Sequence, residues 1–238
     1  MKNKMVFGRS DDGGAFGEIV AAEAEENRRR ERRAEHAAKL TGVHTTMPLK
    51  DIKMVSRWME IAKQHDGERK EGGVSWYMLL LIGFNTGLRI GDLCKLRVKD
   101  VRDRERVRII AEKTDKMTDI KLQVPVQRAI NAELKGMDED DYVLLSRQRG
   151  RKDGKEKPIS RQRCYGIIKD IAKLSGYTEH VGCHTMRKTF AWNFYQTSGD
   201  LAKLQKVLNH SSQEATLHYL GLDQQAVDET IDKMQTMM

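Results

Sequence analysis

The chain contains little of several residue types that mark other classes of protein. Its 238 residues include three prolines and three cysteines, and 6% of them are aromatic. The cysteines, Cys94, Cys164 and Cys183, are widely spaced and form no CxxC pair, which excludes a zinc ribbon or a disulfide scaffold. The longest apolar run, at 78–82, is far shorter than the roughly 20 residues of a membrane span. We therefore expect no membrane segment, no secretory signal and a reducing, cytoplasmic setting.

Charge is the feature that is present in excess. Lys and Arg number 43 against 35 Asp and Glu, which gives a formal net charge of +8. Hydrophobic residues make up 39% of the chain, enough to build a folded core. A chain of this length forms one large domain or two small ones. The positive balance favours a polyanionic partner, although it does not identify one.

Residues 1–46 differ from the rest and are predicted to form a charged N-terminal arm, partly helical or flexible. Residues 18–40 are rich in Ala, Glu and Arg, which favour helix but bury little. Five arginines stand within six positions: Arg28, Arg29, Arg30, Arg32 and Arg33. Two interpretations stay open for this run, a solvated charged surface or an arm on the DNA backbone.

Residues 47–238 are predicted to form one domain that is mostly helical. Helical spacing of apolar residues is found at 51–64, 76–84 and 90–96, and alternating strand patterns at 106–110 and 119–124. Helical patterns return at 126–134, 160–174, 185–196, 200–208, 213–219 and 224–234, with a basic loop at 147–157. This order indicates an α+β fold, mostly α, with a small antiparallel sheet.

Four short motifs carry polar residues beside predicted helix ends. In TGLRIGDL, Arg89 follows a glycine break, where a long side chain can reach an anion beside free backbone N–H groups. In HTMRKTFA, His184 and Arg187 are three residues apart and therefore lie on one helical face. LQKVLNHSS contains His210, and Tyr219 follows nine residues later in TLHYLG. Each motif alone is more typical of an ordinary surface or packing position.

Together, the four motifs resemble the catalytic domain of the tyrosine recombinase (phage integrase) family, in that family's order and spacing. The resemblance covers roughly residues 47–235, and is greatest to short integrase-like proteins of Gram-positive bacteria and their phages. It implies a site-specific DNA recombinase that works through a 3′-phosphotyrosine intermediate. The implied catalytic set is Arg89, Lys113, His184, Arg187, His210 and Tyr219. Lys116 is the alternative for the hairpin lysine. Asp92 is implied to orient the catalytic side chains without binding the substrate itself.

The chemistry of these residue types is consistent with phosphoryl transfer. A phenol with a pKa near 10 is a poor nucleophile at neutral pH and needs a base, for which His184 is the candidate. Two guanidinium groups can bind the scissile phosphate and stabilise the transition state. Lys113 is the candidate acid for the departing 5′-oxygen, and His210 is expected to bind a phosphate oxygen. The phosphotyrosine keeps the bond energy, so we expect no metal and no other cofactor.

Family members usually carry a further N-terminal domain that clamps the other face of DNA. Here we expect the arginine-rich arm or an accessory DNA-binding protein to take that place. The C-terminal segment 223–238 has an amphipathic pattern, which fits packing on its own domain or docking into a neighbouring protomer. We expect the latter, giving a homo-oligomer on double-stranded DNA.

Two other functions use the same fold. A DNA-binding transcriptional regulator would not require catalysis, and a topoisomerase would need a clamp for free rotation of DNA. The complete set of catalytic residue types favours the recombinase. Candidate contacts to the DNA backbone are basic residues near the motifs: Lys95, Arg97, Lys99, Lys116, Arg161, Arg163 and Lys188.

Overall fold

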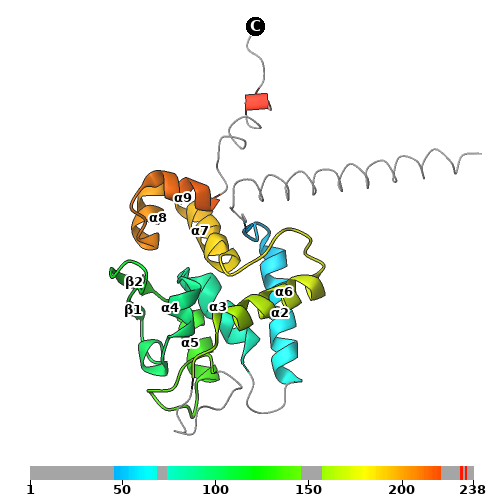
Figure 1. Ribbon diagram of the computed structural model, residues 1–238, viewed down its shortest axis with the longest axis vertical. Helices are drawn as coiled ribbons and strands as arrows, with labels where there is room; N and C mark the ends of the chain where they lie inside the picture. Colours follow the sequence, from blue (N-terminus) through cyan, green and yellow to red (C-terminus); the bar gives the residue numbers. More distant parts are fainter. Residues whose placement is uncertain (1–45, 69–73, 146–156, 221–230, 233, 235–238) are drawn as a thin grey trace, which may run out of the picture. The chain divides into compact units, whose positions relative to one another are not determined.

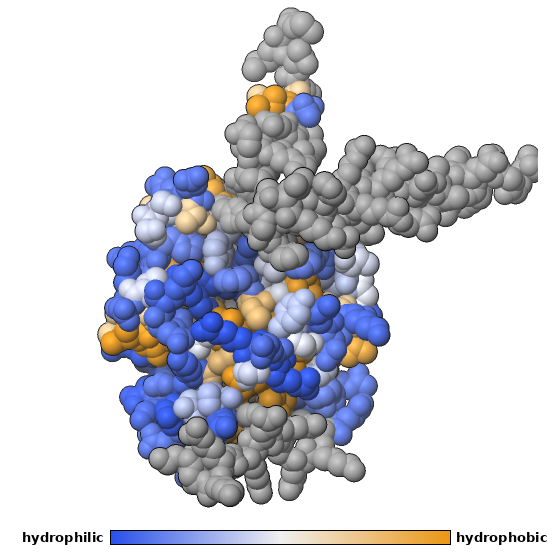
Figure 2. Space-filling view, viewed as in Figure 1, coloured by the Kyte–Doolittle hydropathy of each residue, from blue (hydrophilic) through white to orange (hydrophobic). Residues whose placement is uncertain are grey.

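The structure is a computed structural model that describes residues 46–68, 74–145, 157–220, 231, 232 and 234 (Figure 1). Residues 1–45 of the predicted N-terminal arm, most of the basic loop and most of the C-terminal helix lie outside the described residues. Within the described part of the chain, no helix is both long enough and apolar enough to cross a bilayer. The visible face of the described domain is mostly hydrophilic (Figure 2), in line with a chain that is 33% charged.

Helices dominate the described chain and begin where capping residues predict. Asp51, Ser75, Ser160 and Asp200 each accept a hydrogen bond from a backbone N–H of the helix that follows. The elements in chain order are α2 (Ile52–Gly67), α3 (Trp76–Thr86), α4 (Ile90–Cys94), the 3-10 turn η1 (Val98–Asp100), β1 (Arg106–Ile110), β2 (Met117–Lys121), α5 (Val124–Glu133), α6 (Arg161–Ser175), α7 (Thr185–Ser198), α8 (Leu201–Leu208) and α9 (Gln213–Leu220). The predicted α+β class is confirmed.

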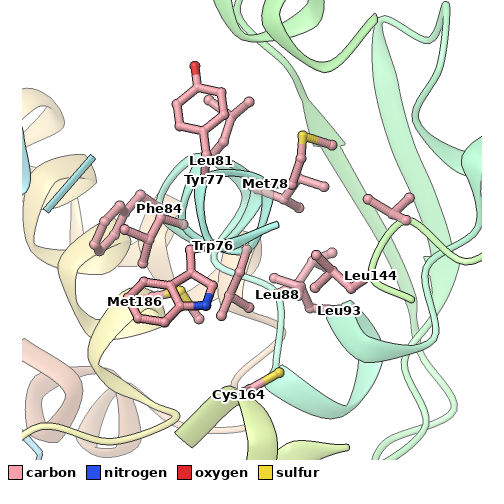
Figure 3. Packing of buried hydrophobic residues seen from close by; sticks show 14 of the residues in the cluster. Trp76, Tyr77, Met78, Leu81, Phe84, Leu88, Leu93, Leu144, Cys164 and Met186 are labelled. Atoms are coloured by element: carbon pink, nitrogen blue, oxygen red, sulfur yellow. The ribbon is translucent and has the colours of Figure 1, made fainter. Parts of the chain in front are cut away.

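Helix α3 forms the centre of the larger hydrophobic core. It is apolar at nearly every position, and ten of its eleven residues are buried. Helices α2, α4, α5 and α7 all contact it, which explains why a helix with no polar face is stable there. Figure 3 shows Leu93 of α4 and Met186 of α7 near the side chains of α3. Trp58 of α2 is fully buried and donates from Nε1 to Ser175 Oγ of α6, so its polar atom is satisfied.

The two strands form a single antiparallel hairpin in which Arg106 pairs with Lys121 and Ile110 with Met117. The first strand lies where the sequence predicts it. The second was predicted at 119–124 and instead spans Met117–Lys121, because Val124 already begins α5. Pro125 stands in the first turn of that helix, where its missing N–H costs nothing.

Helices α7, α8 and α9 lie together (Figure 1), and a smaller apolar cluster joins them. Ala191, Leu204, Leu208 and Leu220 are its buried members. Phe190 of α7 also lies against Gly87, at the end of α3: a Cβ at Gly87 would be 2.4 Å from the Phe190 ring. Gly87 has a φ of 60°, so glycine is required there for conformation and for space. This contact places the segment before Arg89 beside the helix that carries Arg187.

Candidate active site

Arg187 lies at the centre of the site and is held rigidly. Its side chain is only 5% exposed. Nη1 donates to the Gly87 carbonyl at 2.5 Å, and Nη2 donates to the Leu208 carbonyl at 2.7 Å. Its buried Nε has no hydrogen-bond partner in the described structure. The guanidinium therefore connects the end of α3 to the end of α8, while its Nε–H has no acceptor in the described structure.

Arg89 stands at the N-cap of α4, directly after the Gly87 turn. The sequence predicted this position at a helix start, and the prediction is confirmed. The charge of Arg89 helps to lower the pKa values of His184, Arg187 and His210. Arg89 is therefore electrostatically part of the same site.

His210 follows the last turn of α8 and faces Arg187. Its Nε2 lies 3.4 Å from Arg187 Nη2, and its Nδ1 lies 3.1 Å from Thr216 Oγ1 in α9. Burial lowers the pKa of His210 to about 4, and the charges of Arg187 and Arg89 act in the same direction. The ring is therefore neutral at pH 7 in the free protein.

Tyr219 in α9 points to His184, which caps the start of α7. The phenol oxygen lies 3.2 Å from His184 Nδ1. Burial lowers the pKa of His184, and the nearby charges of Arg187, Lys188, Lys113 and Arg89 lower it further. A neutral imidazole with an unprotonated Nδ1 can accept the phenol proton.

The tyrosine ring also lies close to the other members of the set. Its centroid is 4.6 Å from that of the His210 ring and 5.6 Å from the Arg187 guanidinium carbon. His184, Arg187, His210 and Tyr219 therefore converge within one molecule, although 35 positions separate the first from the last.

The hairpin turn between β1 and β2 carries both candidate lysines, and both are exposed. Asp92 of α4 fixes this turn, since its Oδ1 accepts from the Glu112 backbone N–H at 2.9 Å. Lys113 is among the charges that lower the pKa of His184. Asp92 thus acts on the hairpin and also on Arg187: burial lowers the pKa of that guanidinium, and the charge of Asp92 partly opposes the lowering.

The other candidate DNA contacts occupy varied environments. Lys95 and Arg161 both form ion pairs with Glu112, and Lys99 pairs with Asp140. Arg97 donates to the Asp140 carbonyl and stacks on Tyr142, while Arg163 is exposed at the start of α6. Lys188, which was predicted to contact the DNA backbone, is buried. It is 5% exposed and its amine lies 5.9 Å from the Tyr219 ring, because it follows Arg187 on the inward side of α7.

The sequence did not single out several residues that support the site. The carbonyls of Gly87 and Leu208 hold Arg187, Thr216 holds His210, and Asn209 bridges to the hairpin. Of these residues, only Asn209 could have been recognised in the sequence, because asparagine after the last residue of a helix is typical of a left-handed cap. The backbone carbonyls that bind Arg187 could not have been recognised, since a residue of any type can supply a carbonyl.

The cysteines are closer in space than their sequence spacing suggests. Cys94 and Cys164 are buried free thiols whose sulfurs lie 3.6 Å apart. The half-buried Cys183 donates towards the Arg161 carbonyl at 3.7 Å. In the part of the chain that the structure describes, no group of three or more His, Cys, Asp or Glu side chains could hold a metal ion.

Comparison with known proteins decides the family of this chain. The model of the Phage integrase family matches residues 44–226. The chain belongs to the phage integrase family. Most of its length is the catalytic domain of a tyrosine recombinase, as the four motifs indicated.

Curated relatives of this family include probable integrase/recombinase YoeC of Bacillus subtilis, which is 38% identical over 148 residues, 62% of this chain and 78% of that protein. Tyrosine recombinase XerC of Thermodesulfovibrio yellowstonii is 26% identical over 164 residues, 65% of this chain and 52% of that protein. A tyrosine recombinase of Agathobacter rectalis is 30% identical over 136 residues, which are 57% of this chain and 44% of that protein. This chain therefore spans about half the length of the latter two.

Solved structures share the fold of the described domain. The crystal structure of XerA recombinase superposes with a TM-score of 0.60 at 24% identity, covering 81% of this chain and 66% of that one. A lambda integrase dimer bound to a core site gives a TM-score of 0.53 at 19% identity, covering 87% of this chain and 75% of that one. The predicted tyrosine recombinase catalytic-domain fold is confirmed.

Proposed function

We propose that this chain is a site-specific DNA recombinase in which Tyr219 attacks a phosphodiester of double-stranded DNA. The bond from the phenol oxygen to phosphorus forms, and the bond from phosphorus to the 5′-oxygen breaks. The products are a 3′-phosphotyrosine and a free 5′-hydroxyl, and reversal with another 5′-hydroxyl rejoins the strand. The observation that carries this proposal is the 3.2 Å distance between the Tyr219 hydroxyl and His184 Nδ1 beside a buried arginine.

His184 is proposed to accept the proton of Tyr219 as the nucleophile attacks. Its lowered pKa supports this role, because only the neutral ring has a free acceptor nitrogen. Lys113 is proposed to donate a proton to the departing 5′-oxygen. An amine at the tip of an exposed turn can reach a bound strand without first breaking a buried contact.

Arg187, Arg89 and His210 are proposed to bind the oxygens of the scissile phosphate. Arg187 has a buried Nε without a partner, and leaving such a donor unsatisfied costs about 1–3 kcal/mol. A phosphate oxygen would satisfy it. The positive charges around both histidines would also be offset by an anion with one or more negative charges.

The test is covalent capture from a pool of random-sequence duplex oligonucleotides, each containing a nick close to a central position. A cut near the nick releases a short fragment by diffusion, so the protein stays attached to DNA. We expect wild type to give a denaturant-resistant adduct and Tyr219→Phe to give none. The captured DNA then supplies a defined substrate for kinetics.

The regulator alternative predicts a different result in the same assay. A regulator would retain duplexes on a native gel but form no adduct with any of them. That outcome would overturn the recombinase proposal, and so would an adduct that persists in Tyr219→Phe.

Assembly on DNA is proposed to involve several copies of the chain. The lambda integrase structure is described as a dimer bound to a core site, which supports DNA and a second copy as partners. We propose that the segment 223–238 docks into a neighbouring protomer and that an accessory DNA-binding protein assists. Removal of this segment should then abolish assembly on the captured DNA while a monomer still binds it.

The basic residues Lys95, Arg97, Lys99, Lys116, Arg161 and Arg163 are proposed to contact the DNA backbone. Each phosphate contact releases counterions, so loss of one should reduce the slope of log K against log salt by about 1. Lys188 is buried and is proposed to act on the site through its charge. We propose a cytoplasmic location.

A further inference from the structure

Asn209 connects two parts of the active site that are far apart in the chain. It is the C-cap of α8, with φ 53° and ψ 41°, and stands directly before His210. Its Nδ2 lies 3.1 Å from the Met117 carbonyl and 3.1 Å from Thr118 Oγ1, both at the start of β2. The side chain therefore bridges 92 positions of sequence to reach the hairpin.

The hairpin needs such support because it is only a two-stranded sheet. A ribbon of two strands is marginally stable by itself, and the turn that carries Lys113 lies at its end. The turn is held on its β1 side by Asp92, which accepts from the Glu112 N–H at 2.9 Å. Asn209 holds the opposite side, where β2 begins.

These two contacts place the turn between the two halves of the site. Asp92 stands three positions after Arg89, and Asn209 stands one position before His210. The lysine is thereby tied to both segments that hold the phosphate-binding side chains. Asparagine suits this position since it tolerates the left-handed backbone and its amide can donate.

We propose that Asn209 is a positioning residue that holds the hairpin so that Lys113 can protonate the 5′-oxygen of the leaving strand. This inference rests on the proposed function, because it gives Asn209 a role only through Lys113. Asn209 itself does not touch the substrate.

The test compares two versions of the captured duplex in single-turnover assays. One has the natural 5′-oxygen at the scissile position and the other has a 5′-bridging sulfur. A thiol has a pKa near 8.5, so the sulfur leaves as a thiolate without receiving a proton. A defect in proton donation therefore disappears with sulfur, whereas a defect in folding or phosphate binding does not.

We expect Asn209→Gly to form the adduct at least about tenfold more slowly than wild type on the oxygen substrate, as misplacing a catalytic group can cost up to about 10²-fold. On the sulfur substrate its rate should return to that of wild type. Glycine keeps the left-handed backbone and removes only the side chain. Asn209→Asp should behave in the same way, because a carboxylate cannot donate to the Met117 carbonyl.

Two further variants serve as references. Lys113→Ala should show a larger loss on oxygen and the same recovery on sulfur. Asn131→Ala is the matched control, since it also removes side-chain hydrogen bonds, those between Asn131 and Asp103, on a part of the surface outside the site. It should match wild type on both substrates.

The possible results distinguish a failure of the positioning role of Asn209 from a failure of the proposed recombinase function. An equal loss on both substrates in Asn209→Gly, or no loss on either, overturns the positioning role. If the rate of Lys113→Ala on the sulfur substrate stays below that of wild type, Lys113 is not the acid, and the positioning role of Asn209 is then wrong as well. If wild type forms no adduct at all, the proposed function itself is wrong.

Discussion

The Tyr219 hydroxyl and His184 Nδ1 lie 3.2 Å apart in a single molecule. Two helices that start from different parts of the chain, α7 and α9, create this contact. The proposed nucleophile and base therefore lie within hydrogen-bond distance in one copy of the chain.

His184→Ala should slow adduct formation by about 10²–10⁴-fold, the usual contribution of a general base. His184 is proposed to act as the base in its neutral form, so the wild-type rate should rise with pH through the pKa of His184 and then level off. That pKa lies below 6.5 in the free protein, because burial and nearby positive charge lower it. The measurement is adduct formation against pH at sub-saturating enzyme. If the variant keeps the same rising limb, another group is the base.

Arg187→Lys should remove activity and also destabilise the fold. A single ammonium group cannot replace the two nitrogens that donate to the Gly87 and Leu208 carbonyls. One buried carbonyl left without a partner costs about 1–3 kcal/mol in the free energy of unfolding. Urea denaturation measures this loss. Arg108→Lys, at an exposed pair with Asp119, is the control and should change stability by less than about 1 kcal/mol.

His210 should make the protein less stable in mild acid. Its pKa in the folded state is about 4, below the ordinary 6.5, so the unfolded chain binds the proton more readily. The free energy of unfolding should therefore be highest above about pH 6.5 and fall towards pH 4, by at most about 3 kcal/mol. His184 has a lowered pKa and contributes in the same direction. Urea denaturation from pH 4 to 7.5 should show a flatter curve for His210→Gln; parallel curves would contradict the assignment.

Gly83→Ala should loosen the contact between α3 and α7. A Cβ at Gly83 would lie 2.4 Å from Met186 Sδ and 3.1 Å from Met186 Cβ, and Met186 directly precedes Arg187. Overpacking of this kind costs about 1–3 kcal/mol, which outweighs the gain of up to about 1 kcal/mol from alanine in a helix. We expect a lower melting temperature and slower adduct formation.

Gly166→Ala is the matched control for this change. It also lies in a helix, but the nearest heavy atom to its Cβ is Arg163 Nη1, at 3.9 Å. It should stabilise the protein by up to about 1 kcal/mol and leave cleavage unchanged. Stabilisation of similar size in both variants would show that α3 and α7 adjust freely at this contact.

The sequence by itself determined the helical class, the hairpin, the caps at Ser75, Ser160 and Asp200, and the position of Arg89 at a helix start. These are local features: apolar spacing, side-chain caps and glycine breaks act over a few residues and are readable in the chain. The bounds of β2 were misplaced: the predicted strand began two residues late, and its alternation ran on to Val124, which already begins α5. Family resemblance, and not spacing, supplied the candidate set from Arg89 to Tyr219.

Tertiary structure alone decided which groups hold that set in place. The carbonyls of Gly87 and Leu208 reach Arg187 only because α3 and α8 end on either side of α7, and backbone groups carry no residue signature. Lys188 was predicted from the sequence only as a DNA contact, and its burial is decided by the packing of α7. Asn209 meets β2 across 92 positions, a distance over which no local pattern operates.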